Sequence, residues 1–390
     1  MVLPSSSDWL PSAPGTRTRF EITIKHPRDF ELFGQGIQST EPMAGGLAQT
    51  HWSYQGSGAS SISLYGGLGY VKRELKIGGT TITLAVEPRD GDCLDTMAKQ
   101  VDTILKSFSP LGVYPYPQLR IVETGFASGN GNLSNLTVNR VGNDVVSLTM
   151  LAHEMAHSYF AGVVPQDFSK GLWAEGLAEY ASSWCLDQTE QAEKRKEWSQ
   201  TYARLDPNDD CPVPQASNGP GKVRSAVLYR KAALIYSALA DRVGQRAMDQ
   251  ALKSFIEERR GQPSTWDDLF RVFTRTLGPE HADWAKTWLT RTGAPDLQFK
   301  DATVSAGVFS GNLVQTANPP FTGVVEIGFQ DGSGETKIEH LSFALQNTPF
   351  CFKVPPGTKR IILDPDYRLP RQYDPKSDPV KGHICVIPWI

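Results

Sequence analysis

The feature that most constrains the fold of this chain is the segment His153-Glu154-Met155-Ala156-His157, which is followed by Glu175. In a helix, residues four positions apart project from the same face, so the imidazoles of His153 and His157 converge on one point. A catalytic zinc ion (Zn²⁺) takes three protein ligands and leaves its last coordination position open for water. His153, His157 and Glu175 supply such ligands, and Glu154 lies beside them as a candidate general base. The segment therefore predicts a zinc site of the type that hydrolases use.

The residues around this motif predict that it lies on a mostly buried helix. Six neighbouring residues are apolar: Val145, Val146, Leu148, Met150, Leu151 and Met155. Asn143 or Asp144 is expected to cap the start of the helix. A polar group in a buried helix needs a partner, and a metal ion supplies one for both histidines. The alternative is a helix whose two histidines lie on a polar face, because the bare pattern fixes only three positions.

A second apolar helix is predicted to begin at Glu175. Its apolar residues are Leu172, Trp173, Leu177, Tyr180, Ala181 and Trp184. Glu179 lies one turn after Glu175 on the same face, where its carboxylate can hold the free ring nitrogen of a zinc-bound histidine. Such a contact fixes the tautomer and the orientation of the imidazole. The alternative for Glu179 is a plain carboxylate on the helix surface, and the sequence does not decide between the two.

The spacing and the flanking residues resemble the gluzincin aminopeptidases, the family of aminopeptidase N and the leukotriene hydrolase. In that family HExxH is followed, usually after eighteen residues, by Glu within Trp-x-x-Glu-Gly-aromatic-Ala. This chain has seventeen intervening residues, 158–174, which implies that one residue is missing from the connecting loop around Val163 to Gly171. The residues that still fall close to their positions in the family's pattern are Trp173, Glu175, Gly176 and Ala178. The resemblance implies that Glu175 is the third zinc ligand.

A second point of resemblance is Tyr229-Arg230-Lys231-Ala232-Ala233, which is similar to Tyr-Glu-Lys-Gly-Ala in the family. The family's tyrosine hydrogen-bonds the oxyanion of the tetrahedral intermediate, which implies the same role for Tyr229. A phenol aimed at developing negative charge stabilises the transition state more than the substrate. The alternative for Tyr229 is a core aromatic, because its helix also carries Val227, Leu228 and Leu234.

A third stretch follows the family and then departs from it. Residues 108–119 resemble the stretch that leads into the edge strand of the active site, which is predicted here at Leu119–Glu123. Members of the family then carry Gly-x-Met-Glu-Asn, whose glutamate binds the free amino group of the substrate, whereas 125–132 contains no acidic residue. We expect Gly129, Asn130 and Gly131 to contact the substrate, because glycine lets backbone approach a ligand and an exposed edge can pair with an extended peptide.

Glu123 is the nearest acidic residue to these glycines. If its carboxylate points into the cleft, it can replace the missing glutamate from a shifted position. If it points away, the amino terminus of a peptide is not bound by an anion. We predict the second arrangement, because a shift of several residues along a strand displaces a carboxylate by more than a side-chain length.

Composition indicates a soluble multidomain enzyme in a cytoplasmic environment. The net charge of −3 over 390 residues argues against a nucleic-acid partner or an anionic membrane surface. No run of about eighteen apolar residues is present, so no membrane span is predicted, and the first residues show no secretory signal.

The five cysteines are scattered along the chain, as expected of reduced residues: Cys93, Cys185, Cys211, Cys351 and Cys385. Cys351 and Cys385 can pair if the C-terminal domain is exported, and the sequence leaves the oligomeric state open.

Periodicity and the resemblance together predict an α+β fold with three domains. Residues 1–86 form a partial N-terminal antiparallel β domain, 87–294 a mostly helical, thermolysin-like zinc catalytic domain, and 295–390 a C-terminal β-sandwich. By resemblance, the first domain is a truncated form, which leaves room for an anchoring or export segment before Met1. The individual elements predicted are strands Phe20–Lys25, Ser61–Tyr65, Thr80–Val86, Gly323–Phe329, Phe350–Val354 and Lys359–Leu363, a helix Asp92–Phe108, a turn at Gly66-Gly67-Leu68-Gly69 and a helix break at Gly293-Ala294-Pro295.

The leading functional hypothesis is a zinc metallopeptidase that resembles aminopeptidases and hydrolyses peptide bonds through a metal-activated water. One alternative is the use of the same zinc site on a small non-peptide electrophile, as in epoxide opening, so that the substrate is a peptide or a small molecule. A second alternative is a catalytically silent interaction module. The complete ligand set and the presence of Glu154 argue against the silent module.

Overall fold

The computed structural model describes residues 2–3, 18–59, 63–124, 129–132, 135–138, 147–372 and 384–385. The chain separates into two compact units. The first comprises Met1–Asp167, Ala181–Cys185 and Asp249–Thr265, and the second comprises Phe168–Tyr180, Leu186–Met248 and Trp266–Ile390. Each unit is described by itself, and the three-domain division stays a prediction.

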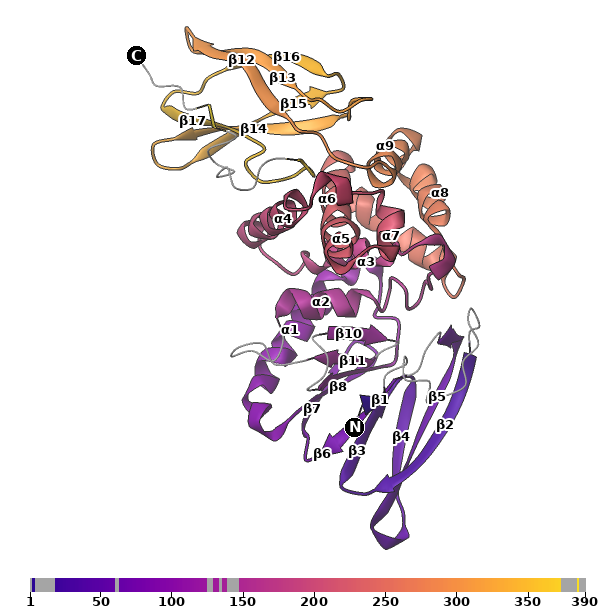
Figure 1. Cartoon of the computed structure of the whole chain (residues 1–390). Helices are drawn as coiled ribbons and strands as arrows, with labels where there is room; N and C mark the ends of the chain where they lie inside the picture. The colour runs from indigo at the N-terminus through magenta and orange to yellow at the C-terminus, as the bar shows by residue number, and fades with distance from the viewer. Residues whose placement is uncertain are drawn as a thin grey trace. The chain divides into compact units, whose positions relative to one another are not determined.

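Two three-stranded antiparallel sheets form the N-terminal part of the first unit (Figure 1). One sheet has the order β2-β5-β4, with β2 at Thr18–Pro27, β5 at Leu47–Ala59 and β4 at Ile37–Pro42. The other has the order β1-β6-β3, with β1 at Val2–Leu3, β6 at Leu64–Leu68 and β3 at Phe30–Gly34. A shared apolar core contains Phe20, Leu32, Trp52 and Leu64. The prediction of antiparallel β structure in this region is confirmed.

The predicted glycine turn is wrong at its first residues. Gly66 and Gly67 lie in β6, and the chain leaves the strand only at Gly69, whose φ is 72°. A Cβ at Gly66 would lie 2.5 Å from the carbonyl oxygen of Glu31, so this strand position needs glycine for the close approach of β3. The predicted strand Ser61–Tyr65 falls partly on residues outside the described ranges.

A five-stranded mixed sheet follows, in the order β10-β11-β9-β8-β7. Its strands are β7 at Val71–Ile77, β8 at Thr80–Val86, β9 at Gln118–Glu123, β10 at Gly129–Asn132 and β11 at Asn135–Val138. β8 and β9 pair in parallel, because a 3₁₀ turn at Pro88–Cys93 and helix α1 at Leu94–Ser107 form the crossover between them. The predicted strand Thr80–Val86 is therefore confirmed, but its partner β9 runs parallel to it.

The edge of this sheet differs from the prediction. β9, predicted as the edge strand, lies between β11 and β8, and the hairpin of β10 and β11 is added beyond it. β10, which contains Gly129, Asn130 and Gly131, is the strand at the edge. Helix α2, at Leu148–Ala156, contacts β10 and β11, so this edge lies beside the helix with the two histidines (Figure 1).

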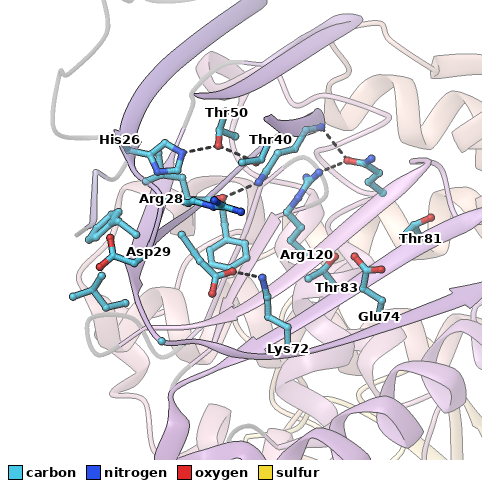
Figure 2. A pocket seen from close by; sticks show the side chains of 18 residues that line it. His26, Arg28, Asp29, Thr40, Thr50, Lys72, Glu74, Thr81, Thr83 and Arg120 are labelled. Atoms are coloured by element: carbon cyan, nitrogen blue, oxygen red, sulfur yellow. Dashed lines mark hydrogen bonds and ion pairs between the residues drawn. The ribbon is translucent and has the colours of Figure 1, made fainter. Parts of the chain in front are cut away.

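A polar groove of about 990 Å³ in the first unit is lined by residues of β2 to β9 (Figure 2). Its deep side chains bond to protein groups: the Arg120 guanidinium donates to the carbonyls of Gly34 and Gly36 at 3.1 and 2.9 Å. His26 and Thr50 are joined by a 2.8 Å hydrogen bond across β2 and β5. The Arg120 bonds connect β9 to the end of β3 in another sheet, and the His26–Thr50 bond joins two strands of one sheet, so we assign the groove a structural role.

The helices from α3 to α9 follow one another along the chain. Their bounds are α3 at Ala174–Ser182, α4 at Gln188–Ala203, α5 at Gly221–Val223, α6 at Ala232–Val243, α7 at Gln245–Arg259, α8 at Trp266–Leu277 and α9 at Pro279–Thr290. A π-helix, η8, occupies Arg224–Lys231 between α5 and α6. Among the described residues, no helix has the length and apolar character needed to cross a membrane.

The end of the second unit consists of two antiparallel sheets (orange to yellow in Figure 1). One has the order β12-β13-β16, at Gln298–Ser305, Val308–Val314 and Asn347–Lys353. The other has the order β15-β14-β17-β18, at Thr336–Phe343, Gly323–Asp331, Thr358–Leu363 and Ile384–Cys385. The rings of Phe309 and Phe329, one from each sheet, lie 6.2 Å apart, so the sheets face each other as the predicted β-sandwich.

Candidate metal centre

Helix α2 places both histidines of the motif on a buried helix, as predicted. Leu151, Ala152, Met155 and Ala156 are fully buried, which anchors one face of the helix in the core of the first unit. The helix begins later than predicted, because the Ser147 side chain accepts a hydrogen bond from the Met150 amide at 3.2 Å. The caps predicted at 143 and 144 lie outside the described residues.

The two imidazoles face each other at the end of α2. The Nε2 atoms of His153 and His157 are 3.2 Å apart, and the ring planes are inclined at 84°. Two nitrogens bound to one tetrahedral zinc at about 2.05 Å would be about 3.3 Å apart. The histidine pair is therefore spaced as ligands of a single zinc ion would be.

A backbone carbonyl holds the second histidine. His157 Nδ1 lies 3.1 Å from the carbonyl oxygen of Phe160. Because a carbonyl oxygen only accepts hydrogen bonds, Nδ1 carries the proton and Nε2 of the neutral ring presents its lone pair. The sequence does not reveal this orienting contact, since every residue has a carbonyl and no side-chain pattern marks it.

Glu175 completes the candidate ligand group from the first turn of α3. One ligand atom each from His153, His157 and Glu175 lies within 4.8 Å of the others. Two neutral imidazoles and a carboxylate are donors that zinc accepts in catalytic sites. The donor set therefore fits Zn²⁺, and the expected three residues come together in spite of the shortened connection.

The connection between the two ligand helices is held by other parts of the chain. Its first half is bonded to the segment after α7, with Gly261 donating to the Val163 carbonyl at 2.7 Å and Ser264 donating to the Pro165 carbonyl at 2.9 Å. Further along, Gly171 has φ 84°, and a Cβ there would lie 2.5 Å from the Pro214 carbonyl oxygen. These contacts, as well as the residue count, set where α3 begins.

Glu179 is buried, with 6% of its surface exposed, which excludes the surface alternative. Trp198 Nε1 donates to Glu179 Oε1 at 2.7 Å, and the Lys194 and Arg230 nitrogens lie 3.6 and 3.9 Å from the same oxygen. The carboxylate therefore ties α3 to α4 and η8. A contact between Glu179 and a histidine ring stays a prediction.

Tyr229 lies in the π-helix η8, a wide-turn conformation that often occurs at functional sites. Its neighbours Val227 and Leu228 are buried, at 0% and 1% exposure, whereas Tyr229 itself is only half-buried. The guanidinium of Arg230 lies 5.7 Å from the centre of the Tyr229 ring. The partial exposure favours the functional role over a core aromatic, and that role stays a prediction.

Residues 134–288 match the family model described as "Peptidase family M1 domain". The match assigns residues 134–288, and not the whole chain, to peptidase family M1. The match begins before α2 and ends in α9, so it includes the candidate ligand group and Tyr229. The predicted resemblance to the aminopeptidase N family is thereby confirmed.

Individual aminopeptidases match parts of this chain at low identity. Aminopeptidase N of Streptomyces lividans is 23% identical over 186 residues, which cover 45% of this chain and 22% of that protein. Aminopeptidase M1 of Arabidopsis thaliana is 23% identical over 331 residues, 77% of this chain and 36% of that protein. The crystal structure of Legionella pneumophila aminopeptidase A in complex with aspartic acid aligns with a TM-score of 0.72 at 16% identity and covers 95% of this chain and 47% of that one. The chain therefore shares the fold of the corresponding part of that solved structure, and it spans less than half the length of each of these three proteins.

The remaining predicted site residues are described less completely. Glu154 is half-buried on α2, next to His153. Gly129, Asn130 and Gly131 have their backbone in β10, paired with 136–138 of β11, and 125–128 lie outside the described residues. Their contacts with substrate stay predictions.

Glu123 has a partner away from β10. Its Oε2 accepts a hydrogen bond from the Glu87 amide at 2.9 Å, and the residue is 2% exposed. Burial raises the pKa of this carboxyl above its usual range. This arrangement favours the prediction that Glu123 does not replace the family's missing glutamate.

Replacing Gly162 with alanine in the M1 domain is expected to weaken zinc binding about ten- to a hundredfold. Gly162 donates to the His157 carbonyl at 2.9 Å, and an added Cβ would lie 2.6 Å from the Ser158 carbonyl oxygen and 2.8 Å from that of His157. The turn must then open and move the Phe160 carbonyl from His157. Zinc affinity measured by competition with a chelator tests this, with Gly79→Ala, at an open position, as the control. Equal affinities in the two variants would contradict the positioning role of the turn.

Proposed function

We propose that this chain is a zinc-dependent metallopeptidase that hydrolyses peptide bonds in the manner of an aminopeptidase. The observation that carries the proposal is the convergence of His153, His157 and Glu175 within 4.8 Å, inside a peptidase family M1 domain. Glu154 adjoins this group in sequence and supplies the carboxylate that the chemistry needs. The fold shared with an aminopeptidase supports the same assignment.

In this proposal each side chain has one task. Zinc, when bound, acts as a Lewis acid and lowers the pKa of water from 15.7 to about 7. Glu154 accepts a proton from the attacking water and returns it to the nitrogen of the leaving amine. Tyr229 donates a hydrogen bond to the oxyanion of the tetrahedral intermediate. The Phe160 carbonyl keeps His157 in the tautomer that offers Nε2.

The backbone of β10 supplies the proposed peptide-binding edge. A peptide in extended conformation can pair with an edge strand through its main-chain groups, and β10 is the strand at the end of the sheet beside α2. Main-chain pairing of this kind does not require a free amino terminus. We therefore propose that the substrate binds along β10 and that any recognition of its amino terminus depends on a separate group.

A second candidate function is hydrolysis of a small non-peptide electrophile at the same zinc site. The specific observation in its favour is that 125–132 contains no acidic residue and that the Glu123 carboxylate is bonded to the Glu87 amide. Because the site has no anion to pair with a substrate ammonium, a substrate that lacks a peptide amino terminus can bind as well as one that has it. Turnover of epoxides but not of aminoacyl amides or blocked peptides would favour this candidate.

Metal analysis and a substrate screen test the proposal. Protein purified with zinc supplied should contain about one equivalent of zinc, and less than about half an equivalent would favour a silent interaction module instead. The screen compares aminoacyl amides with amino-terminally blocked peptides. Hydrolysis of either class that disappears in Glu154→Gln supports the metallopeptidase, whereas hydrolysis of neither class contradicts it.

Acetylation of a peptide's amino terminus is expected to lower kcat/KM by less than about a hundredfold. A carboxylate that pairs with a substrate ammonium in a dry cleft compensates a cost of several kcal/mol, and the described residues of β9 and β10 show no such free carboxylate. The measurement compares one peptide with and without the acetyl group, and Glu154→Gln provides the background rate. A loss greater than a hundredfold, about 2.7 kcal/mol, would instead indicate a strict aminopeptidase.

A further inference from the structure

A buried ion pair lies at the end of the helix that carries Tyr229. Lys231 is fully buried, and its Nζ lies 3.4 Å from Oδ1 of Asp210, whose side chain is 2% exposed. The same Nζ donates to the carbonyl of Arg291 at 3.2 Å. Desolvation lowers the pKa of Lys231, and the Asp210 carboxylate acts in the opposite direction.

Asp210 is bonded to several segments of the second unit. Its Oδ2 accepts from the Tyr202 hydroxyl at 2.6 Å and from the Gly293 amide at 2.9 Å. Its Oδ1 accepts from the amide of Cys211 at 2.8 Å. α4, the loop after it, the end of η8 and the segment after α9 therefore meet at one carboxylate.

Such a pair is not explained by stability alone. Taking two charges out of water is unfavourable for each ion, and apolar residues of similar volume often stabilise a fold as well or better. What the pair adds is a fixed direction, because Lys231 can reach Asp210 and the Arg291 carbonyl in one orientation of its helix. The structural consequence is a helix that cannot rotate about its axis without breaking these bonds.

The position of Lys231 relative to Tyr229 determines what is fixed. Residues two apart on a helix point to roughly opposite sides, so an anchor at Lys231 holds the helix from the side away from the Tyr229 ring. The backbone between them is in the wide π-turn, with the Ala232 amide bonded to the carbonyls of both Val227 and Tyr229. This continuous helical backbone joins the two residues, so an anchor at Lys231 acts on the backbone that carries Tyr229.

We propose that Lys231, held by Asp210, is a positioning residue for Tyr229 and sets the direction of its hydroxyl. This inference rests on the proposed function, in which Tyr229 stabilises the oxyanion. Neither Lys231 nor Asp210 touches substrate in this scheme. Both act through the orientation of the π-helix.

A double-mutant cycle of Lys231→Met and Tyr229→Phe tests the inference. Misplacement of a catalytic group by about 1 Å can cost about a hundredfold in rate, so Lys231→Met is expected to lower kcat ten- to a hundredfold with KM within about twofold. In the Tyr229→Phe background the same substitution is expected to cause no further loss, because the hydroxyl that it misplaces is already gone. Lys222→Met, which removes an exposed ion pair with Asp209 near the start of the same helical segment, is the control and should leave kcat unchanged.

The outcomes separate this inference from the proposed function. If Tyr229→Phe lowers kcat and Lys231→Met lowers it by the same factor in both backgrounds, the positioning role is wrong and the proposed function stands. If Tyr229→Phe leaves kcat unchanged, the role of Tyr229 and the inference fall together. Asp210→Asn, which keeps the shape of the side chain, should reproduce the effect of Lys231→Met.

A spectroscopic measurement tests the inference even where no enzymatic rate can be measured. In protein labelled with 3-fluorotyrosine, the ¹⁹F resonance of Tyr229 is assigned by its loss in Tyr229→Phe. We expect this resonance to shift or broaden in Asp210→Asn and to stay in place in Lys222→Met. An unchanged Tyr229 resonance in a folded Asp210→Asn protein would overturn the inference.

Discussion

Replacing Glu154 with glutamine is expected to lower kcat/KM by about three orders of magnitude while zinc stays bound. The carboxamide has nearly the shape of the carboxylate, so α2 and the two histidines should keep their places. It cannot accept the proton of the attacking water or return one to the leaving amine, and general acid–base catalysis contributes about 10²- to 10⁴-fold. The measurements are kcat/KM on the best peptide found and zinc content by elemental analysis.

The control for this prediction is Glu193→Gln, which neutralises an exposed carboxylate on α4 whose ion-pair partner is Lys196. It should keep both activity and zinc. A Glu154→Gln protein with one equivalent of zinc and near-normal kcat/KM would remove Glu154 as the base. A protein that loses its zinc would instead show that Glu154 supports the metal site.

Replacing Glu175 with glutamine is expected to weaken zinc binding more than about a hundredfold and to abolish activity with it. A neutral amide is a weaker ligand than a carboxylate, and the remaining pair of imidazoles leaves the ion without charge compensation. Dialysed variant protein should contain little zinc, and added zinc should restore only part of the activity. Chelator competition gives the affinity directly.

Glu179→Gln is the matched comparison, one helical turn away on α3. Replacing a residue that only orients a metal ligand usually lowers metal affinity ten- to a hundredfold, so this variant should retain more zinc than Glu175→Gln. The reverse order would mean that Glu179 is the ligand and that the shortened connection has shifted the assignment by one turn. The two variants together therefore locate the third donor.

The sequence predicts those site residues whose side chains are brought together by helical spacing. His153 and His157 are four residues apart on a helix whose other residues are apolar, and local geometry alone brings their rings together. The C-terminal sandwich was predictable for a related reason, since alternating apolar residues such as Val325, Ile327 and Phe329 leave one face of a strand buried.

The parts that were not predicted depend on backbone atoms and on distant pairing. The Phe160 carbonyl that holds His157 is invisible in a sequence, because its direction comes from the turn at Ala161, with φ 86°, and Gly162. β9 was expected at the edge of its sheet, and it lies inside because a hairpin later in the chain pairs beyond it. The sequence of β9 alone does not show that β11 pairs with it, because the two strands meet only in the folded sheet.

The way in which the segment after α2 is bonded has a consequence for recognising such centres in other chains. Val163 and Pro165 are tied to residues 261–264, and Gly171 lies against the Pro214 carbonyl, so the place where α3 begins is set by neighbours that are far away in sequence. A residue can be lost between such fixed points while the carboxylate of Glu175 still arrives beside the imidazoles. A search pattern that demands one interval between HExxH and the third ligand would reject this chain. A pattern that allows the interval to vary, but requires glycine immediately after the glutamate, follows the constraint that packing imposes, since a Cβ at Gly176 would lie 2.5 Å from that of Ala232.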